Sequence, residues 1–337
     1  MSQDSSKNLV VLGGSYGGVS TAHYLLKHVV PQLPNRASYQ VILISTSSQA
    51  ICRPACPRAL LSDDMFPQEK LFDGVPQQFE QYPKDSFRFI QGTATKLDHD
   101  DRYVTASLKD GITEEIAYHA LVIATGTSTA SPLLGLNGDS ESLRATWKTF
   151  REALPNAKHI VIAGGGPTGV ETAGELGEYL NGRAGWFSSK LENPKVTITL
   201  VTAGSKILPV LRPAIAKKAE NFLAQVGVMV ITGSRVATVL PTSVGTESVL
   251  TTNTTVTLKD GKILEADLYI PATGAIANTG FIYKSLLTAS SSVETNISTL
   301  RIDNTSTRVY ADLFIIEGKE ECAVGADRVF KEDTRET

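Results

Sequence analysis

Apolar and polar positions follow each other along the chain in two rounds of the same order. An apolar run of strand length at residues 8–14, NLVVLGG, leads into glycines and a segment of helical period, and HIVIAGG at 159–165 begins the same succession. In each round a second apolar run follows, then segments turned by Asp-Gly, which favours hairpins, and then a last apolar run. This order predicts an α/β fold with a parallel sheet at the centre of each half.

Short motifs repeat between the two halves at a nearly constant separation. GGSYGG returns as GGGPTG, LKDG returns unchanged and ATG returns unchanged, in the same order and each about 150 residues later. With 337 residues the chain is long enough for about two domains. The sequence therefore predicts two related, Rossmann-like nucleotide-binding halves.

The glycine motifs at 13–18 and 164–169 are candidate phosphate-binding turns. A helix N-terminus offers free N–H groups and the positive end of the dipole to a pyrophosphate. The first glycine makes the turn, the second admits the phosphates, and the third lets the helix pack on the strand. The second half fills these positions with Gly164, Gly166 and Gly169. The first half has Gly13 and Gly18 but Ser15 in the middle, which predicts a modified site rather than a lost one.

The residue after the second strand of each half bears on the choice of nicotinamide cofactor. The fingerprint usually places a ribose-binding acid there, whereas this chain has Ser45 and Thr202. Without the acid a 2′-phosphate is not repelled, and Lys206 is near in sequence. Hydroxyl and backbone groups would hold the ribose of NADH equally well, so NADH and NADPH both stay open.

Composition excludes several other classes of protein. The net charge is only -3, and no dense run of Lys and Arg tracks a phosphate backbone, so we expect no nucleic-acid partner. Three cysteines suit a reducing compartment, and the N-terminus lacks a signal pattern, so we expect a cytoplasmic protein. No apolar run is long enough for a membrane span, which leaves peripheral membrane contact open. No spacing typical of a metal site stands out either.

The chain resembles the two-dinucleotide-binding-domain flavoproteins, and within them the apoptosis-inducing-factor-related oxidoreductases that include ferroptosis suppressor protein. The motifs that carry the resemblance are VVLGGSYGGVSTA, RPACPRAL, ALVIATGTS, IVIAGGGPTGVETAGEL and ADLYIPATGAIANTGFI, which span nearly the whole chain. The resemblance implies FAD on the first half, NAD(P)H on the second, and hydride transfer from nicotinamide to flavin. It implies an FAD domain of residues 1–140 and 275–337, with an NAD(P)H domain of 141–274 inserted.

The resemblance also implies a set of site residues. Glu171 would be an acid near the nicotinamide and flavin rings, although a first-turn glutamate can simply complement a helix dipole. The residues expected to bind FAD are Gly13, Gly14, Ser15, Tyr16, Gly17, Gly18, Arg58, Ala94 and Gly126. The residues expected to bind NAD(P)H are Gly164, Gly165, Gly166, Thr168 and Gly169.

The C-terminal end departs from the family pattern. After the strand expected at 309–316 the family has Gly-Asp, whose Asp binds the ribityl chain, but here Lys319 follows Gly318 and Glu321 stands where that Asp belongs. The chain also stops at residue 337, sooner than its relatives. Glu321 is therefore a candidate FAD ligand, and the alternative is an NAD(P)H-binding or regulatory protein that has lost its flavin.

Two further features leave alternatives open. Cys52 and Cys56 could form the redox pair of a dithiol-linked reductase, but their spacing favours small residues packed near the flavin. The WFSS at 186–189 could be an exposed contact, although packing on the core is the favoured interpretation. For the electron acceptor, the resemblance points to a quinone or another small organic molecule; an apoptosis-type role on DNA is disfavoured by the charge.

Overall fold

The structure is a computed structural model that describes residues 6–246, 249–287, 314–317 and 320–323. Its first half is built on an eight-stranded sheet, in which β8, β1, β2 and β5 run parallel in that spatial order. The strands of this sheet are β1 (Lys7–Leu12), β2 (Tyr39–Ser45), β5 (Phe87–Asp98), β6 (Tyr103–Leu108), β7 (Thr113–Ala117), β8 (Ala120–Ile123), β18 (Phe314–Glu317) and β19 (Glu320–Ala323). Helix α1 (Tyr16–Tyr24) follows β1, as the helical period after the first glycines predicts.

The second half repeats this plan with a smaller sheet. Its four strands, in the order β12-β11-β10-β16, are all parallel. They are β10 (His159–Ala163), β11 (Thr197–Val201), β12 (Val228–Ile231) and β16 (Leu268–Pro271). Helix α6 (Pro167–Asn181) follows β10, and α7 (Pro213–Gln225) leads into β12. Antiparallel strands β13 (Val236–Leu240), β14 (Thr254–Leu258) and β15 (Ile263–Ala266) supply the predicted hairpins.

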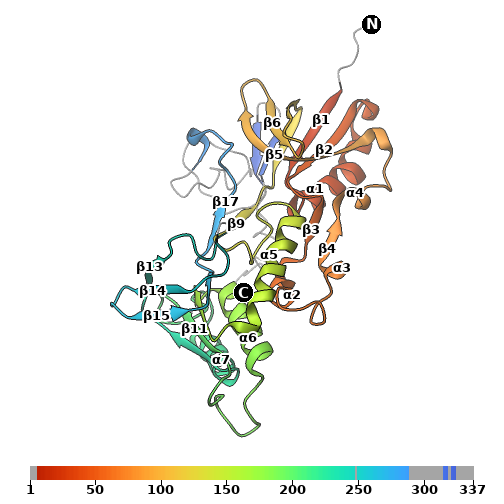
Figure 1. Ribbon diagram of the computed structural model, residues 1–337. Helices are drawn as coiled ribbons and strands as arrows, with labels where there is room; N and C mark the ends of the chain where they lie inside the picture. The colour runs from red at the N-terminus through yellow and green to blue at the C-terminus, as the bar shows by residue number, and fades with distance from the viewer. Residues whose placement is uncertain (1–5, 247–248, 288–313, 318–319, 324–337) are drawn as a thin grey trace, which may run out of the picture.

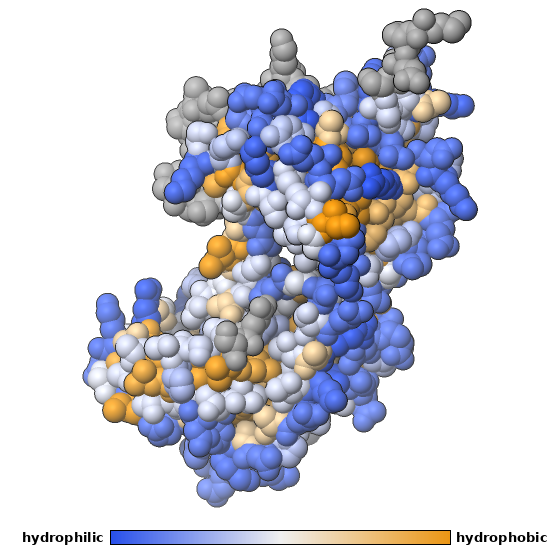
Figure 2. Space-filling model, turned by 45° about the horizontal axis from the view of Figure 1, so that its top comes forward, coloured by the Kyte–Doolittle hydropathy of each residue, from blue (hydrophilic) through white to orange (hydrophobic). Residues whose placement is uncertain are grey.

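The two halves are joined by a pair of short strands. β9 (Thr127–Thr129) leaves the first half and pairs antiparallel with β17 (Ala275–Ala277), which returns to it (Figure 1). Beyond β17, buried Ile282 and Leu286 pack in the same cluster as Val10 and Leu12 of β1. The molecule narrows and is hollowed where these connections lie (Figure 2). This return of the chain supports the discontinuous first domain, whose boundaries at 140/141 and 274/275 remain our proposal.

A continuous apolar cluster runs from the first half into the second. Helix α5 (Ser140–Ala153) starts at Asp139, whose carboxylate accepts from the N–H of Ser142 at 2.7 Å. Its side chains Trp147 and Phe150 are fully buried, and the Trp147 indole N–H donates to the carbonyl of Leu133 at 3.0 Å. The same cluster includes apolar side chains of the segment 51–72, such as Leu60 and Phe72, and one face of the second sheet.

The C-terminal strands partly match the sequence. The strand expected at 309–316 appears as β18, which pairs antiparallel with β8 and with β19. Residues 309–313 lie outside the described part, as do the side chains of β18 and β19. Glu321 therefore lies on β19, but its side-chain contacts are outside the described part, and its role as an FAD ligand stays a prediction. Within the described residues, no helix is both long and apolar enough to cross a bilayer.

Candidate active site

The first glycine turn is held between three strands at the end of the sheet. The N–H of Gly13 donates to the carbonyl of Ile44 at 2.8 Å, and its φ of +110° suits glycine alone. A Cβ on Gly13 would stand 2.1 Å from the carbonyl oxygen of Ala124, and one on Gly18 would stand 1.7 Å from the oxygen of Gly13. The first and third glycines of this turn are therefore required by the backbone itself.

The second glycine turn has the same geometry. The N–H of Gly164 donates to Val201 at 2.8 Å, its φ is +128°, and a Cβ there would stand 2.0 Å from the oxygen of Ala272. A Cβ on Gly169 would stand 2.0 Å from the oxygen of Gly164. Both turns thus present the N-terminus of a helix of two or more turns at the carboxyl edge of a parallel sheet, where such sheets bind ligands.

The middle position of each turn, Ser15 in the first and Gly166 in the second, shows whether the turn has room for a nucleotide. A Cβ on Gly166 would meet nothing within 4 Å, so no protein atom requires glycine there. Ser15 takes the corresponding N-cap position of α1, is exposed, and makes no capping hydrogen bond with its side chain. The open side of each turn therefore leaves space for a pyrophosphate, with a free hydroxyl available in the first half.

The other turn residues support the backbone around these positions. Gly14 lies against Ser45, and Gly165 lies against Thr202, with added Cβ atoms 2.6 Å from the nearest side-chain atoms. The carbonyl of Gly17 accepts from the hydroxyl of Thr21 at 2.7 Å. Thr168 repeats this contact with the hydroxyl of Thr172, also at 2.7 Å. Ser45 and Thr202 thus shape the turns, a role that the search for a ribose-binding acid could not reveal.

The second half carries features that sequence reasoning missed. The N–H of Leu208 donates to the carbonyl of Gly165 at 2.7 Å, which ties the loop after β11 to the glycine turn. The ammonium of Lys206 donates to the carbonyl of Leu211 in the same loop. Ser234 is buried beside Thr202, and its hydroxyl has no partner among the described residues. Leu208, Lys206 and Ser234 all lie in loops that follow strands of the second sheet. No motif or spacing in the sequence marks them as neighbours of the glycine turn.

Tyr16 brings the first glycine turn close to the cysteine segment. Partial burial and then a hydrogen bond with Cys52 raise the pKa of the Tyr16 hydroxyl. Cys56, on the short helix α2 (Cys56–Ala59), is 2% exposed, and burial raises the pKa of its thiol to about 12. Both thiols are free. Cys56 therefore stays a protonated thiol near neutral pH, which is a poor nucleophile.

Helix α6 carries Glu171, and Arg58 of α2 lies beside the same helix. The Arg58 guanidinium donates through two nitrogens to the carboxylate of Glu175, with a shortest distance of 2.8 Å. Glu171 precedes Glu175 by one helical turn, and the surrounding protein together with the negative charge of Glu175 raises the pKa of Glu171 although the residue is exposed. The structure thus gives the predicted flavin-binding arginine a carboxylate partner that the sequence did not indicate.

Two predicted FAD-binding residues remain: Ala94 lies on β5 of the first sheet, and Gly126 directly precedes the linking strand β9. Ala94 is half-buried on β5, where the pairing with β6 shifts register. Thr93 beside it contacts Thr46 after β2, with 3.3 Å between the hydroxyl oxygens. Gly126 has a φ of +63°, and its carbonyl accepts from the N–H of Asn278 at 2.9 Å. Among the described residues, no group of three or more His, Cys, Asp or Glu could hold a metal.

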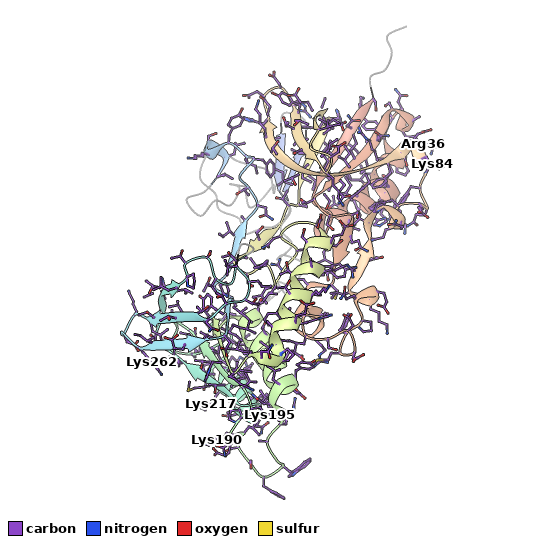
Figure 3. The ribbon with its side chains drawn as sticks, in the orientation of Figure 1. Arg36, Lys84, Lys190, Lys195, Lys217 and Lys262 are labelled. Atoms are coloured by element: carbon purple, nitrogen blue, oxygen red, sulfur yellow. The ribbon has the colours of Figure 1, made fainter. Side chains whose placement is uncertain are left out.

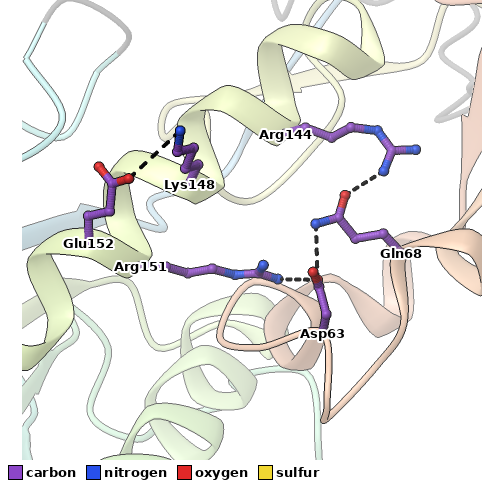
Figure 4. A pocket seen from close by; sticks show the side chains of 6 residues that line it. All are labelled: Asp63, Gln68, Arg144, Lys148, Arg151 and Glu152. Atoms are coloured by element: carbon purple, nitrogen blue, oxygen red, sulfur yellow. Dashed lines mark hydrogen bonds and ion pairs between the residues drawn. The ribbon is translucent and has the colours of Figure 1, made fainter.

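A separate pocket of about 440 Å³ lies between α5 and the segment that follows α2 (Figure 4). Its polar side chains bind one another: Arg151 donates to Asp63 at 2.9 Å, and Arg144 bonds Gln68. Arg151 also donates to the carbonyls of Ala59 and Leu60. These bonds fasten the cysteine-containing segment to α5, so this pocket is best explained as structural.

Comparison with known proteins identifies the family of this chain. The family model for pyridine nucleotide-disulphide oxidoreductases matches residues 7–313. Oxidoreductase phnG of Penicillium herquei is 63% identical over 99% of this chain and 86% of its own length. The type II NADH:quinone oxidoreductase of Haemophilus influenzae is 25% identical over 81% of this chain and 65% of its own length.

The remaining comparisons bear on the resemblance and the fold. Ferroptosis suppressor protein 1 of Taeniopygia guttata is 27% identical over 70% of this chain and 55% of its own length. The solved structure of the water-forming NADH oxidase from Lactobacillus brevis bound to NADH superposes with a TM-score of 0.65 at 18% identity. That match covers 89% of this chain but 60% of the oxidase. The predicted resemblance and fold class are confirmed: the chain belongs to the pyridine nucleotide-disulphide oxidoreductase family, as an oxidoreductase of the FAD- and NAD(P)H-dependent kind.

Proposed function

We propose that this protein passes hydride from NAD(P)H on the second glycine turn to FAD on the first, and electrons from there to a quinone-like acceptor. The observation that carries the proposal is the shared geometry of the two turns. Each has a first glycine at a φ above +100° and no room for a Cβ at its first and third glycines. The middle position is open around Gly166 in the second turn and holds an exposed serine, Ser15, in the first. One fold that presents two such helix N-termini suits two dinucleotides.

The chain's own residues would orient the two cofactors rather than react. FAD, when bound, supplies the acceptor for hydride from the nicotinamide, so no nucleophile or metal is needed in the protein. Backbone N–H groups of 15–18 in the first turn, and of Gly166, Thr168 and Gly169 in the second, would hold the two pyrophosphates; Pro167 has no N–H to donate. Glu171, one helical turn before Glu175, would face the rings. The surrounding protein and the negative charge of Glu175 raise the pKa of this carboxyl above that of an ordinary glutamate.

The acceptor is proposed from the relatives. A matched relative is named for quinone reduction, and this chain aligns with 65% of its length. A quinone takes up two electrons and two protons; hydride from NAD(P)H would supply both electrons and one proton, and solvent would supply the second proton. The choice between a quinone and another small organic acceptor belongs to the proposal, as does cytoplasmic location.

The first experiment is the absorbance spectrum of the purified protein between about 350 and 500 nm, followed by anaerobic addition of NADH and NADPH in turn. A flavin spectrum that bleaches supports hydride transfer, and the faster nucleotide gives the preference that Thr202 and Lys206 leave open. A colourless protein that FAD cannot reconstitute would overturn the proposal and favour the NAD(P)H-binding alternative.

The dithiol-linked alternative has less support. Its reaction needs a thiolate near neutral pH, whereas the Cys56 thiol is buried with a pKa raised to about 12. The Cys52→Ser and Cys56→Ser variants should each keep quinone turnover within about twofold of the unchanged protein. Loss of turnover in both variants, with flavin retained, would favour the dithiol reductase. A DNA-binding role would need salt-sensitive retention on DNA.

A further inference from the structure

Trp186 and Phe187 stand at the corner of an ordered turn in the loop between α6 and β11. The N–H of Ser188 donates to the carbonyl of Gly185 at 2.8 Å, which closes the turn around the two aromatic residues. Trp186 is 95% exposed and Phe187 is 100% exposed. The expectation that this segment packs on the core is therefore wrong. Turn corners usually carry small or polar residues, so two bare aromatic side chains there need another explanation.

The base of this loop is fixed to the fold. The N–H of Ala184 donates to the carbonyl of Gln225 at 2.8 Å, and the N–H of Leu191 donates to Ala224 at 2.9 Å. Both ends of the loop are thus tied to the last turn of α7, and only residues 185–190 project from it. In Figure 1 the loop after α6 extends beyond α7 at the lower end of the molecule. The aromatic pair is held out from the surface rather than left loose.

The same end of the molecule is basic, unlike the chain as a whole. Residues 178–195 and 212–225, which form the end of α6, the loop and α7, carry six basic and three acidic side chains. The whole chain has a net charge of -3. Figure 3 shows Lys190, Lys195 and Lys217 gathered at this end. A basic end beside exposed aromatic residues would be attracted to an anionic surface.

We propose that residues 185–190 are a contact site for an anionic lipid bilayer, with Trp186 and Phe187 entering the headgroup region. Aromatic side chains favour that region, and the bilayer would remove from water the apolar surface of Trp186 and Phe187 that the protein's own core leaves exposed. A projecting corner suits a bilayer, which needs no pocket of matching shape. The protein would bind the bilayer surface without crossing it, and this contact does not depend on the proposed electron transfer.

Intrinsic fluorescence tests this directly, because the chain has two tryptophans and Trp147 is fully buried. Phosphatidylcholine vesicles with about one third phosphatidylglycerol should shift Trp186 emission to the blue and protect it from acrylamide. The double variant Trp186→Ser/Phe187→Ser should sediment with these vesicles at least about tenfold less. Ile112→Ser, which removes another exposed apolar residue at a loop tip, should sediment normally. Trp186→Phe should still sediment, without the blue shift.

Three results would overturn the proposal. The first is an unchanged emission spectrum with every vesicle composition. The second is equal sedimentation of the double variant and the unchanged protein. The third is a blue shift that follows protein concentration without lipid, which would assign the aromatic pair to contact with a second copy of the chain. None of these measurements depends on flavin content or turnover, so they are separate from the test of the oxidoreductase.

Discussion

The two glycines Gly164 and Gly166 should respond to the same substitution in opposite ways. Gly164 has a φ of +128°, and an added Cβ would stand 2.0 Å from the oxygen of Ala272. Alanine at this position would adopt a disfavoured backbone conformation, which costs about 1–3 kcal/mol. Its Cβ would also collide with Ala272, which directly follows β16, and would push β16 away from β10. We expect Gly164→Ala to lower the free energy of unfolding of the second half by about 3 kcal/mol or more.

Gly166 offers the matched control. Its φ is -74°, which alanine adopts freely, and an added Cβ meets no protein atom within 4 Å. Gly166→Ala should therefore cost the fold less than about 1 kcal/mol, the difference between glycine and alanine as an N-cap. Its methyl group would instead occupy the space proposed for the pyrophosphate, so NAD(P)H should bind at least about tenfold more weakly, or about 1.4 kcal/mol.

Urea unfolding followed by tryptophan emission would measure the stability of each variant, and nucleotide titration would measure binding. We expect the two substitutions to affect different properties. Gly164→Ala should lower the free energy of unfolding, whereas Gly166→Ala should leave it nearly unchanged and weaken NAD(P)H binding. Equal destabilisation by the two changes, or unimpaired NAD(P)H binding by Gly166→Ala, would refute the assignment of the open side of this turn to the nucleotide.

Other predictions follow from the core and the charged groups. Burial raises the pKa of the Cys56 thiol from 9.0 to about 12, so the thiol ionises at lower pH in the unfolded chain than in the folded one. Between about pH 9 and pH 12 this thiol should therefore lower the free energy of unfolding by about 1.4 kcal/mol per pH unit. Cys56→Ala should lack this part of the pH slope in chemical unfolding, and identical slopes would contradict the buried thiol. Glu175→Gln removes the negative charge that helps raise the pKa of Glu171, so the Glu171 carboxyl should titrate at lower pH in carbon-13 NMR, with Glu171→Gln identifying its signal. Trp147→Ala should cost about 3–5 kcal/mol of unfolding free energy, because it empties a fully buried site and leaves the Leu133 carbonyl without its donor. A loss below about 1 kcal/mol would show that the cluster around α5 does not link the halves as described.

The sequence alone determined the repeated plan of this protein. The alternation of apolar runs, glycines and Asp-Gly turns predicted two parallel sheets, and the structure has them at β1-β2 and β10-β11. The reason is local: strand period, helix period and turn residues each act over a few positions. The first and third glycines of each turn were likewise predictable: the first has a positive φ that favours glycine, and the third has no room for a Cβ beside the carbonyl of the first.

The tertiary structure decided which side chains meet across these local units. The pairing of Arg58 with Glu175 joins residues 117 positions apart, and no periodicity in the sequence brings them together. The burial of Cys56 and the exposure of Trp186 also depend on how α2 packs on α6 and how the loop is tied to α7. Contacts of this kind arise from the packing of distant elements, so a pattern read along one chain predicts the turns but not their surroundings.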